Sequence, residues 1–364
     1  MGTSTAAFVG PAPAGSAGPS KAPLATLEDF ERQYGDGTDL RYTDGTRTPN
    51  FMWHAARAFF ANGGVRLWIV RLATKDSRPP DPADYSAAFD QLAVVPDVAI
   101  VAAPGATFGY ERGRQRESDA IVQALVAHAE RMRYRFAVID SGDGQSTAQV
   151  RTMRAAIDSP NAALYYPWVR AIDPSSGNEL GLSPSGFVAG IYARVDASRG
   201  VHKAPANELV TLATGLEREI ASAEQDALNR DGINALRRFP GRGVLVWGDR
   251  TVSSDSDWKY VNVRRLMLFL EDSIDRGLQW AVFEPNGDAL WNTVRRTVED
   301  FLASVWQDGA LLGSRPDEAF FVKCDRSTMT QDDIDNGRLV CLIGEAAIKP
   351  AEFVVFKIRK GDGS

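Results

Sequence analysis

The sequence predicts an α/β first half built on a largely parallel sheet, followed by an α+β second half. Between residues 50 and 166, short apolar runs alternate with amphipathic stretches across short connections, which is typical of a parallel sheet covered by helices. Beyond residue 243 the amphipathic stretches lengthen, and residues 319–360 contain three strand-like apolar runs. The chain therefore changes character once, near its second third.

The elements of the first half follow from capping residues and periodicity. Asn50 is placed to cap a helix that Asn62, Gly63 and Gly64 end, and residues 65–72 then predict a buried strand. The remaining predicted strands are residues 97–102, 136–139 and 163–166, and the predicted helices are residues 118–132 and 146–157.

The second half is predicted in the same way. Asp288 is placed to cap a long helix with apolar residues at spacings of three and four, and Gly309 ends it. Thr330 and Asp333 have capping-box spacing for one helical turn. The other predicted elements are a helix at 260–276 and strands at 243–247, 278–283, 319–324, 338–343 and 352–360. We place the domain boundary in the Arg-rich segment 237–243, which gives domains of residues 1–238 and 239–364.

Composition excludes several classes of protein. The 364 residues carry a net charge of −6, so there is no basic field for nucleic acid or an anionic membrane. No apolar run is long enough to span a bilayer, and residues 1–21 lack the pattern of a signal peptide. The two cysteines, Cys324 and Cys341, are too few for a disulfide framework or a zinc site, and they indicate free thiols. We expect synthesis in the cytoplasm.

One pair of segments is similar to subtilisin-like serine proteases. VIDSG at 138–142 resembles their aspartate segment, and GTSTA at 2–6 resembles their serine segment. A protease needs a histidine to activate the serine, but His54 and His128 lie in amphipathic stretches and His202 lies in a loop. The segments also occur in the wrong order. We predict no catalytic residues and keep a subtilisin-like hydrolase as the alternative.

Other chemistry is not indicated. The sequence has neither a phosphate-binding loop nor a dinucleotide fingerprint. Asp332, Asp333 and Asp335 lack the glycine and glutamate positions of a calcium loop, so neither a cofactor nor a metal is predicted. The arginine pairs at 237–238, 264–265 and 295–296 are either solvated or cross a subunit boundary to an acidic patch.

An ordered set of segments resembles the contractile tail sheath family of phage tails, R-type pyocins and extracellular contractile injection systems. In the second half these are GRGVLVWGDRT (241–251), NVRRL (262–266), FEPN (283–286), KCD (323–325), an Asn-Gly turn (336–337) and PAEF (350–353). In the first half they are TSTAAFVGPA (3–12), TLEDFERQYG (26–35) and GFVAGIYARVDASRGVHKAPAN (186–207). The resemblance covers essentially the whole chain.

The resemblance implies a subtilisin-like α/β domain without the triad, followed by a tail sheath C-terminal domain. It implies a structural subunit that stacks in hexameric rings around an inner tube and contracts to drive that tube through a target envelope. Its implied partners are copies of itself, the tube protein, and the baseplate and tail terminator proteins, within a phage tail or a released particle. A sheath-like terminator or baseplate-proximal paralogue is a further alternative.

The family also implies where subunits join. Terminal arms complete a neighbour's sheet, and we assign this role to a C-terminal linking strand containing Phe353, Val354, Val355, Phe356 and Ile358, whose apolar and polar positions partly alternate. The sequence begins without the family's N-terminal linking arm, so we expect weak self-assembly. Arg295 and Arg296, on the 288–306 helix, are our candidates for contact with the tube or a neighbour.

Overall fold

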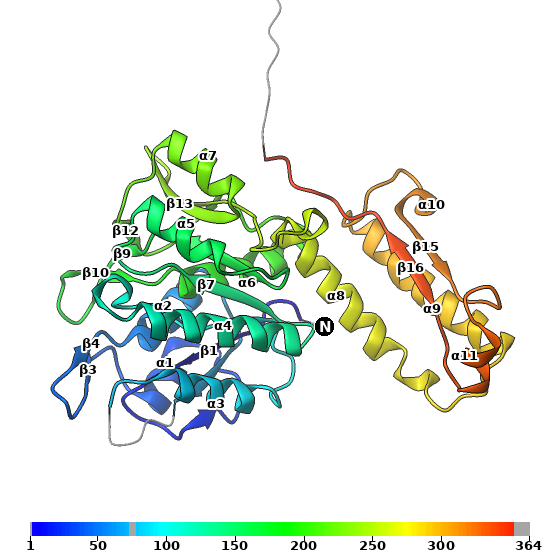
Figure 1. The fold of residues 1–364 in the computed structure, drawn as a ribbon, viewed down its shortest axis with the longest axis horizontal. Helices are drawn as coiled ribbons and strands as arrows, with labels where there is room; N and C mark the ends of the chain where they lie inside the picture. Colours follow the sequence, from blue (N-terminus) through cyan, green and yellow to red (C-terminus); the bar gives the residue numbers. More distant parts are fainter. Residues whose placement is uncertain (1, 73–77, 353–364) are drawn as a thin grey trace, which may run out of the picture.

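The computed structural model describes residues 2–72 and 78–352 of the chain. Figure 1 shows a large α/β lobe and a smaller lobe, which are joined through helix α8 (Val261–Gly277). The smaller lobe holds the last helices and a two-stranded sheet. The change of pattern in the sequence therefore corresponds to two packing units.

A nine-stranded sheet organises the large lobe, in the order β11-β14-β13-β8-β7-β6-β1-β5-β2. The strands from β13 to β5 in that order are parallel. The outer pairings β13–β14, β14–β11 and β5–β2 are antiparallel. The bounds are β1 Ala6–Gly10, β2 Gly18–Pro19, β5 Leu67–Arg71, β6 Ile100–Ala102, β7 Phe136–Asp140, β8 Ala162–Tyr166, β11 Glu208–Leu209, β13 Ile233–Phe239 and β14 Gly243–Trp247. The predicted α/β class with a largely parallel sheet is confirmed.

Alternation along the central strand explains why helices cover both faces of the sheet. In β1, Ala6 and Phe8 pack into one core while Ala7 and Val9 pack into the other, and all four are fully buried. The first core includes α2 and α6, and the second includes α3, α4, α5 and α7. The helix bounds are α1 Leu27–Tyr34, α2 Phe51–Ala61, α3 Pro82–Leu92, α4 Gln115–Arg131, α5 Thr147–Ala155, α6 Ser185–Arg199 and α7 Ser222–Arg230.

Two small sheets complete the large lobe. The strands β9 (Val169–Ile172), β10 (Glu179–Leu182) and β12 (Ala213–Leu216) form an antiparallel sheet in the order β10-β9-β12. The strands β3 (Leu40–Arg41) and β4 (Arg47–Thr48) pair as a hairpin.

The small lobe has a core of its own. Its α9 (Asp288–Gln307) buries Val298 and Leu302 against Leu266 of α8, as the predicted spacing requires. The remaining elements are α10 Pro316–Ala319, β15 Phe320–Lys323, α11 Gln331–Asp335 and β16 Leu342–Glu345. After β16 the chain returns to the large lobe, where Glu352 forms an ion pair with Arg250.

Two predicted features of this region are wrong. Residues 278–283 are not a strand, because residues 279–281 form a 3-10 helix and Phe283 is fully exposed at a φ of 69°. Among the strands that the structure describes, none pairs with this segment. Asp288 does not cap α9; Gly287 is the capping residue and Asp288 is the first helical residue, where its charge favours the positive end of the helix dipole.

The predicted terminal strands have mixed outcomes. The strand at 319–324 corresponds to β15, but the strand at 338–343 is shifted to Leu342–Glu345 because Arg338 closes the α11 turn by donating its N–H to Asp333. The predicted linking strand, including Phe353, Val354, Val355, Phe356 and Ile358, lies outside the described residues.

The domain division at residues 238 and 239 falls inside the sheet of the large lobe. Strand β14 pairs with β13 through residue 239, so a cut there separates two hydrogen-bonded strands. We propose instead that the first domain extends through β14 to about residue 252.

Candidate assembly site

The carboxyl end of the parallel sheet, where α/β enzymes hold their sites, is filled by side chains. Asp140 ends β7, and its carboxylate accepts hydrogen bonds from the backbone N–H (2.6 Å) and hydroxyl (2.7 Å) of Ser185. The carbonyl of Ser141 accepts hydrogen bonds from Trp168 (2.7 Å) and Thr107 (2.8 Å). Burial raises the pKa of Asp140 to about 7 although the Ser185 bonds oppose it. Asp140 and Ser141 are therefore buried and engaged in hydrogen bonds within the fold.

The histidines are not placed to activate a serine. His54 and His128 are buried in α2 and α4, and burial lowers their pKa values to about 4 and about 3, so both are neutral at pH 7. The Nε2 atom of His128 lies 2.8 Å from Arg135. Among the described residues, no hydrogen bond joins a histidine to Asp140 or Ser141. The part of the chain that the structure describes therefore contains no assembled triad.

A serine-directed fluorophosphonate probe should leave this protein unlabelled. Ser141 is fully buried and lacks an activating base, and Ser4 lies in the turn before β1 without a histidine partner. The measurement is intact mass after incubation, with a subtilisin as the positive control. Labelling at Ser4 or Ser141 would revive the hydrolase alternative.

The described residues show neither a metal site nor a membrane-spanning helix. Residues 2–72 and 78–352 contain no group of three or more His, Cys, Asp and Glu side chains placed to hold a metal ion. Within the same ranges, no helix has both the length and the apolar character needed to cross a bilayer.

The two-stranded sheet of the small lobe has open edges. Strands β15 and β16 pair with each other in the register Phe321↔Gly344 and Lys323↔Leu342, and neither has a further strand partner among the described residues. The N–H of Ala346 donates to the carbonyl of Ala319, so the backbone groups of residues 342 and 344 face β15. The backbone groups of residues 343 and 345 therefore face away from β15, along the outer edge of β16.

Side chains at this sheet are also incompletely covered. Phe321 is 60% exposed and Leu342 is 50% exposed, both on the outer face, and Ile343 at the edge is 37% exposed. Gly344 lets the Phe321 ring lie across β16, because a Cβ at residue 344 would come within 2.1 Å of that ring. The Oε2 atom of Glu345 is shielded from solvent but has no hydrogen-bond partner among the described residues. An exposed, partly apolar strand edge is a ready template for another chain.

The predicted contact residues on α9 lie on its polar side. Arg295 forms an ion pair with Glu299 one turn later, at 3.2 Å, and both side chains are about one-third exposed. Arg296 is exposed, and no ion pair is observed for it within the described part of the chain. Arg295 lies close enough to Cys324 and Asp325, directly after β15, to act on both electrostatically. The role of the two arginines in tube or neighbour contact stays a prediction.

The junction between the lobes is polar and tightly paired. Arg265 of α8 donates to both carboxylate oxygens of Asp196 in α6 at 2.9 and 2.6 Å, and both side chains are almost fully buried. Arg265 also donates to the carbonyl of Thr3. Arg265 is therefore paired within the subunit, and Arg264 also bonds within it, to the Oδ1 atom of Asn161 at 2.8 Å.

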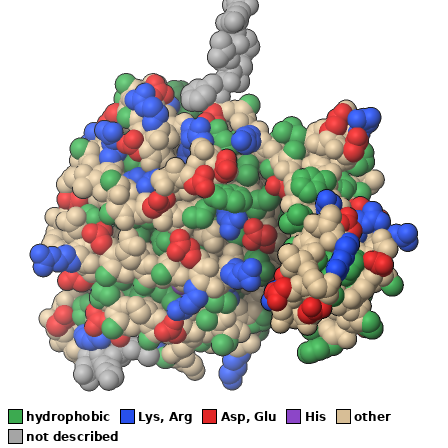
Figure 2. Space-filling model, turned by 45° about the vertical axis from the view of Figure 1, so that its right-hand side comes forward, with side chains coloured by type: hydrophobic (Ala, Val, Ile, Leu, Met, Phe, Trp, Pro, Cys, Tyr) green, Lys and Arg blue, Asp and Glu red, His purple; other side chains and the backbone are tan. Residues whose placement is uncertain are grey.

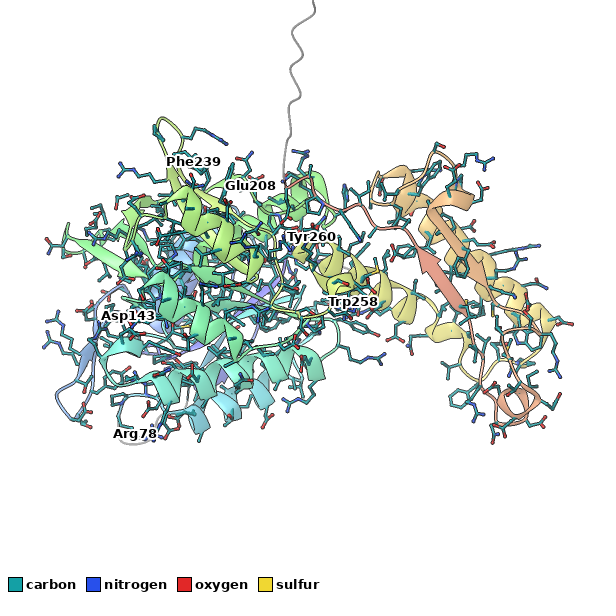
Figure 3. All side chains as sticks on the ribbon, turned by 45° about the horizontal axis from the view of Figure 1, so that its top comes forward. Arg78, Asp143, Glu208, Phe239, Trp258 and Tyr260 are labelled. Carbon is teal, nitrogen blue, oxygen red and sulfur yellow. The ribbon has the colours of Figure 1, made fainter. Side chains whose placement is uncertain are left out.

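A second ion pair holds the returning chain at the same junction. Glu352 accepts hydrogen bonds from Arg250 at 2.7 and 2.8 Å and from the Tyr260 hydroxyl at 3.2 Å. Figure 3 shows Tyr260 and Trp258 close to the start of α8, where the two lobes meet. The return segment is thus fixed at the root of the small lobe.

The surface carries no field of a single sign on the face shown in Figure 2, where red and blue side chains are interspersed over both lobes. This agrees with the modest net charge of −6. Subunit contacts on that face would therefore depend on individual pairs of opposite charge, and not on a positive surface that meets a negative one.

Comparison with known proteins decides what this architecture is. Residues 80–252 match the phage tail sheath protein central domain, and residues 253–360 match the phage tail sheath C-terminal domain. A chain of the anti-feeding prophage helical sheath in its contracted state is 31% identical, with a TM-score of 0.81 over 99% of this chain and 94% of that one. The chain belongs to the phage tail sheath family.

Further sheath structures and sequences are similar. The sheath complex of the PVC extracellular contractile injection system, in the contracted state, is 29% identical with a TM-score of 0.79 over 100% of this chain and 93% of that one. A chain of the anti-feeding prophage baseplate is 30% identical with a TM-score of 0.82 over 99% of this chain and 94% of that one.

Curated relatives are longer. A putative prophage major tail sheath protein of Pseudomonas aeruginosa is 25% identical over 67% of this chain and 62% of its own length. The tail sheath protein of Burkholderia phage BcepMu is 29% identical over 49% of this chain and 41% of its own length. The chain therefore spans less than two thirds of the length of these relatives.

Membership of the sheath family makes the protein structural and not enzymatic. The sequence singled out Arg265 as one of an arginine pair, but it identified neither its partner Asp196 nor the open sheet edge. Arg265 and Asp196 lie 69 positions apart, and nothing in their spacing links them. The edge at residue 343 depends on a register that a single sequence does not reveal.

Proposed function

We propose that this chain is the structural subunit of a contractile tail sheath, which polymerises around an inner tube and contracts to drive it through a target envelope. The observation that carries the proposal is that β15 and β16 have no third strand beside them in residues 2–72 and 78–352, in a chain that matches contractile sheath subunits along its whole length. A sheet with free edges on a separate lobe is suited to receive strands from neighbouring copies.

The proposed partners are copies of the same chain in stacked hexameric rings, an inner tube, a baseplate and a tail terminator. Strand addition at β15 or β16 would link subunits through main-chain hydrogen bonds. Such links keep neighbours connected while the large lobes change their positions during contraction. The residues 353–358 named above are our candidates for the strand that a neighbouring copy inserts.

The deciding experiment is negative-stain electron microscopy of the chain co-expressed with its tube partner. Along the tube we expect stacked rings whose width increases when they shorten, whereas the chain without the tube should assemble weakly, as expected above from the sequence. A chain that stays monomeric beside correctly assembled tubes would contradict the proposal.

A sheath-like paralogue next to the baseplate is the second candidate, because one similar chain comes from a baseplate structure. The same preparation separates the two candidates. A sheath subunit covers the tube along its length, whereas a paralogue stops after the rings that adjoin the baseplate.

A further inference from the structure

Two cysteines face each other in the sheet of the small lobe. Residue 324 directly follows β15 and residue 341 directly precedes β16, so the pair is the next position after Lys323↔Leu342 in the antiparallel register. Opposed residues in such a register place their side chains on the same face. Both thiols are free in this structure.

The burial of the two cysteines agrees with their placement on one face of the sheet. Cys324 is 1% exposed and belongs to the cluster formed with Trp291 and Val294 of α9, and Cys341 packs against the same cluster. Both cysteines therefore lie on the inner face of the sheet, toward α9. Phe321 and Leu342 occupy the opposite, exposed face.

The hydrogen-bonding pattern favours a bond between them. Alternation from the Ala319–Ala346 hydrogen bond makes 321↔344 and 323↔342 hydrogen-bonded pairs. Extending the register by one residue beyond the ladder makes 324↔341 a non-hydrogen-bonded pair. Cα atoms in such pairs lie about 4.5 Å apart, within the roughly 4.4–6.8 Å span that a disulfide bridges.

We propose that Cys324 and Cys341 are a disulfide site, reduced in the producing cell and closed once the particle meets a low-molecular-weight disulfide outside it. The more exposed Cys341 attacks the small disulfide and releases one thiol. The Cys324 thiolate then attacks the Cys341 sulfur and releases the second thiol. Two protein thiols are oxidised and one small disulfide is reduced to two thiols, so atoms and electrons balance.

The environment makes this reaction slow. Burial raises the pKa of Cys324, and burial together with the neighbouring Cys324 raises the pKa of Cys341 to about 12. Since the thiolate is the attacking species, few molecules react at any moment near neutral pH. The reduced form therefore persists during synthesis in a reducing compartment, and the bond accumulates with long exposure.

The disulfide would hold together the two strands of the sheet that we propose joins subunits. The bond closes a loop over residues 325–340, which includes α11, and holds the ends of β15 and β16 together. The placing of the reaction outside the cell rests on the proposed function, but the pairing of the two thiols does not.

The test uses the purified full chain, reduced and then incubated with oxidised glutathione. We expect both thiols to disappear together, with a mass loss of two hydrogens and a 324–341 cross-link in non-reducing peptide maps. The thermal midpoint should rise by roughly 5 °C relative to the reduced protein. Two titratable thiols after denaturation, or a disulfide-linked dimer, would overturn the proposal.

Single variants provide the matched controls. Cys341→Ser keeps only the buried Cys324, which should stay reduced and show no change in thermal midpoint with oxidant. Cys324→Ser keeps Cys341, which should form a glutathione adduct that its partner cannot resolve. Because these readouts come from isolated subunits, their failure is independent of whether the chain forms a sheath.

Discussion

Replacing Ile343 with proline is expected to abolish sheath assembly while leaving the subunit folded. The backbone N–H of residue 343 points away from β15, so its loss spares the pairing between β15 and β16. It removes a donor from the open edge of β16, and the proline ring obstructs an incoming strand. Each main-chain hydrogen bond contributes about 0.5–1.5 kcal/mol, and every subunit contact in the sheath would lose it.

The measurement is tube formation with the tube partner, scored by electron microscopy and by sedimentation. Ile343→Thr is the matched control, because it reduces the apolar side chain but keeps the N–H. The circular dichroism spectrum and the thermal midpoint of the proline variant should stay close to those of the parent protein. A proline variant that assembles normally would show that the outer edge of β16 is not a joining edge.

Replacing Arg265 with methionine is expected to reduce the free energy of unfolding by about 3–5 kcal/mol. The substitution keeps much of the side-chain volume but leaves the buried carboxylate of Asp196 without its partner. It also removes the hydrogen bond to Thr3 and the contact of the guanidinium with the Tyr192 ring, 4.5 Å away.

Urea unfolding of the isolated chain measures this loss. Arg295→Met is the matched control, since its partner Glu299 is about one-third exposed and the pair should contribute about 0.3–0.5 kcal/mol. Adding Asp196→Leu to Arg265→Met should recover much of the lost stability, because no buried charge then remains unpaired. An equally small loss of unfolding free energy in Arg265→Met and Arg295→Met would contradict the stabilising role given to the buried Arg265–Asp196 pair.

Much of the local structure in both lobes could be predicted from local pattern, because caps and periodicity act over a few residues. Asn50 caps α2 by accepting from the N–H of Trp53, and Thr330 forms its capping box with Asp333, as their spacing indicates. The helix α6 was not predicted, since residues such as Phe187, Gly190 and Ile191 are buried all around and leave no polar face to define a period.

Features that depend on distant partners could not be predicted. Residues 278–283 have the composition of a strand, but a strand needs a neighbour, and the chain turns instead with Phe283 in solvent. The facing of Cys324 and Cys341 likewise required the register, because β16 begins later than the apolar run at 338–343 indicates. Nothing in the spacing of the two cysteines fixed that register.

The ion pair of Glu352 with Arg250 and its hydrogen bond with Tyr260 determine where a mechanical load would enter the fold. These residues hold the end of the return segment at the base of α8, where the small lobe joins the large one. Tension applied to the chain beyond Glu352 would therefore act at this junction and not at the distant tip of the small lobe. The load would then act close to the junction of the two lobes. Tension between adjoining subunits would therefore exert little torque on the small lobe.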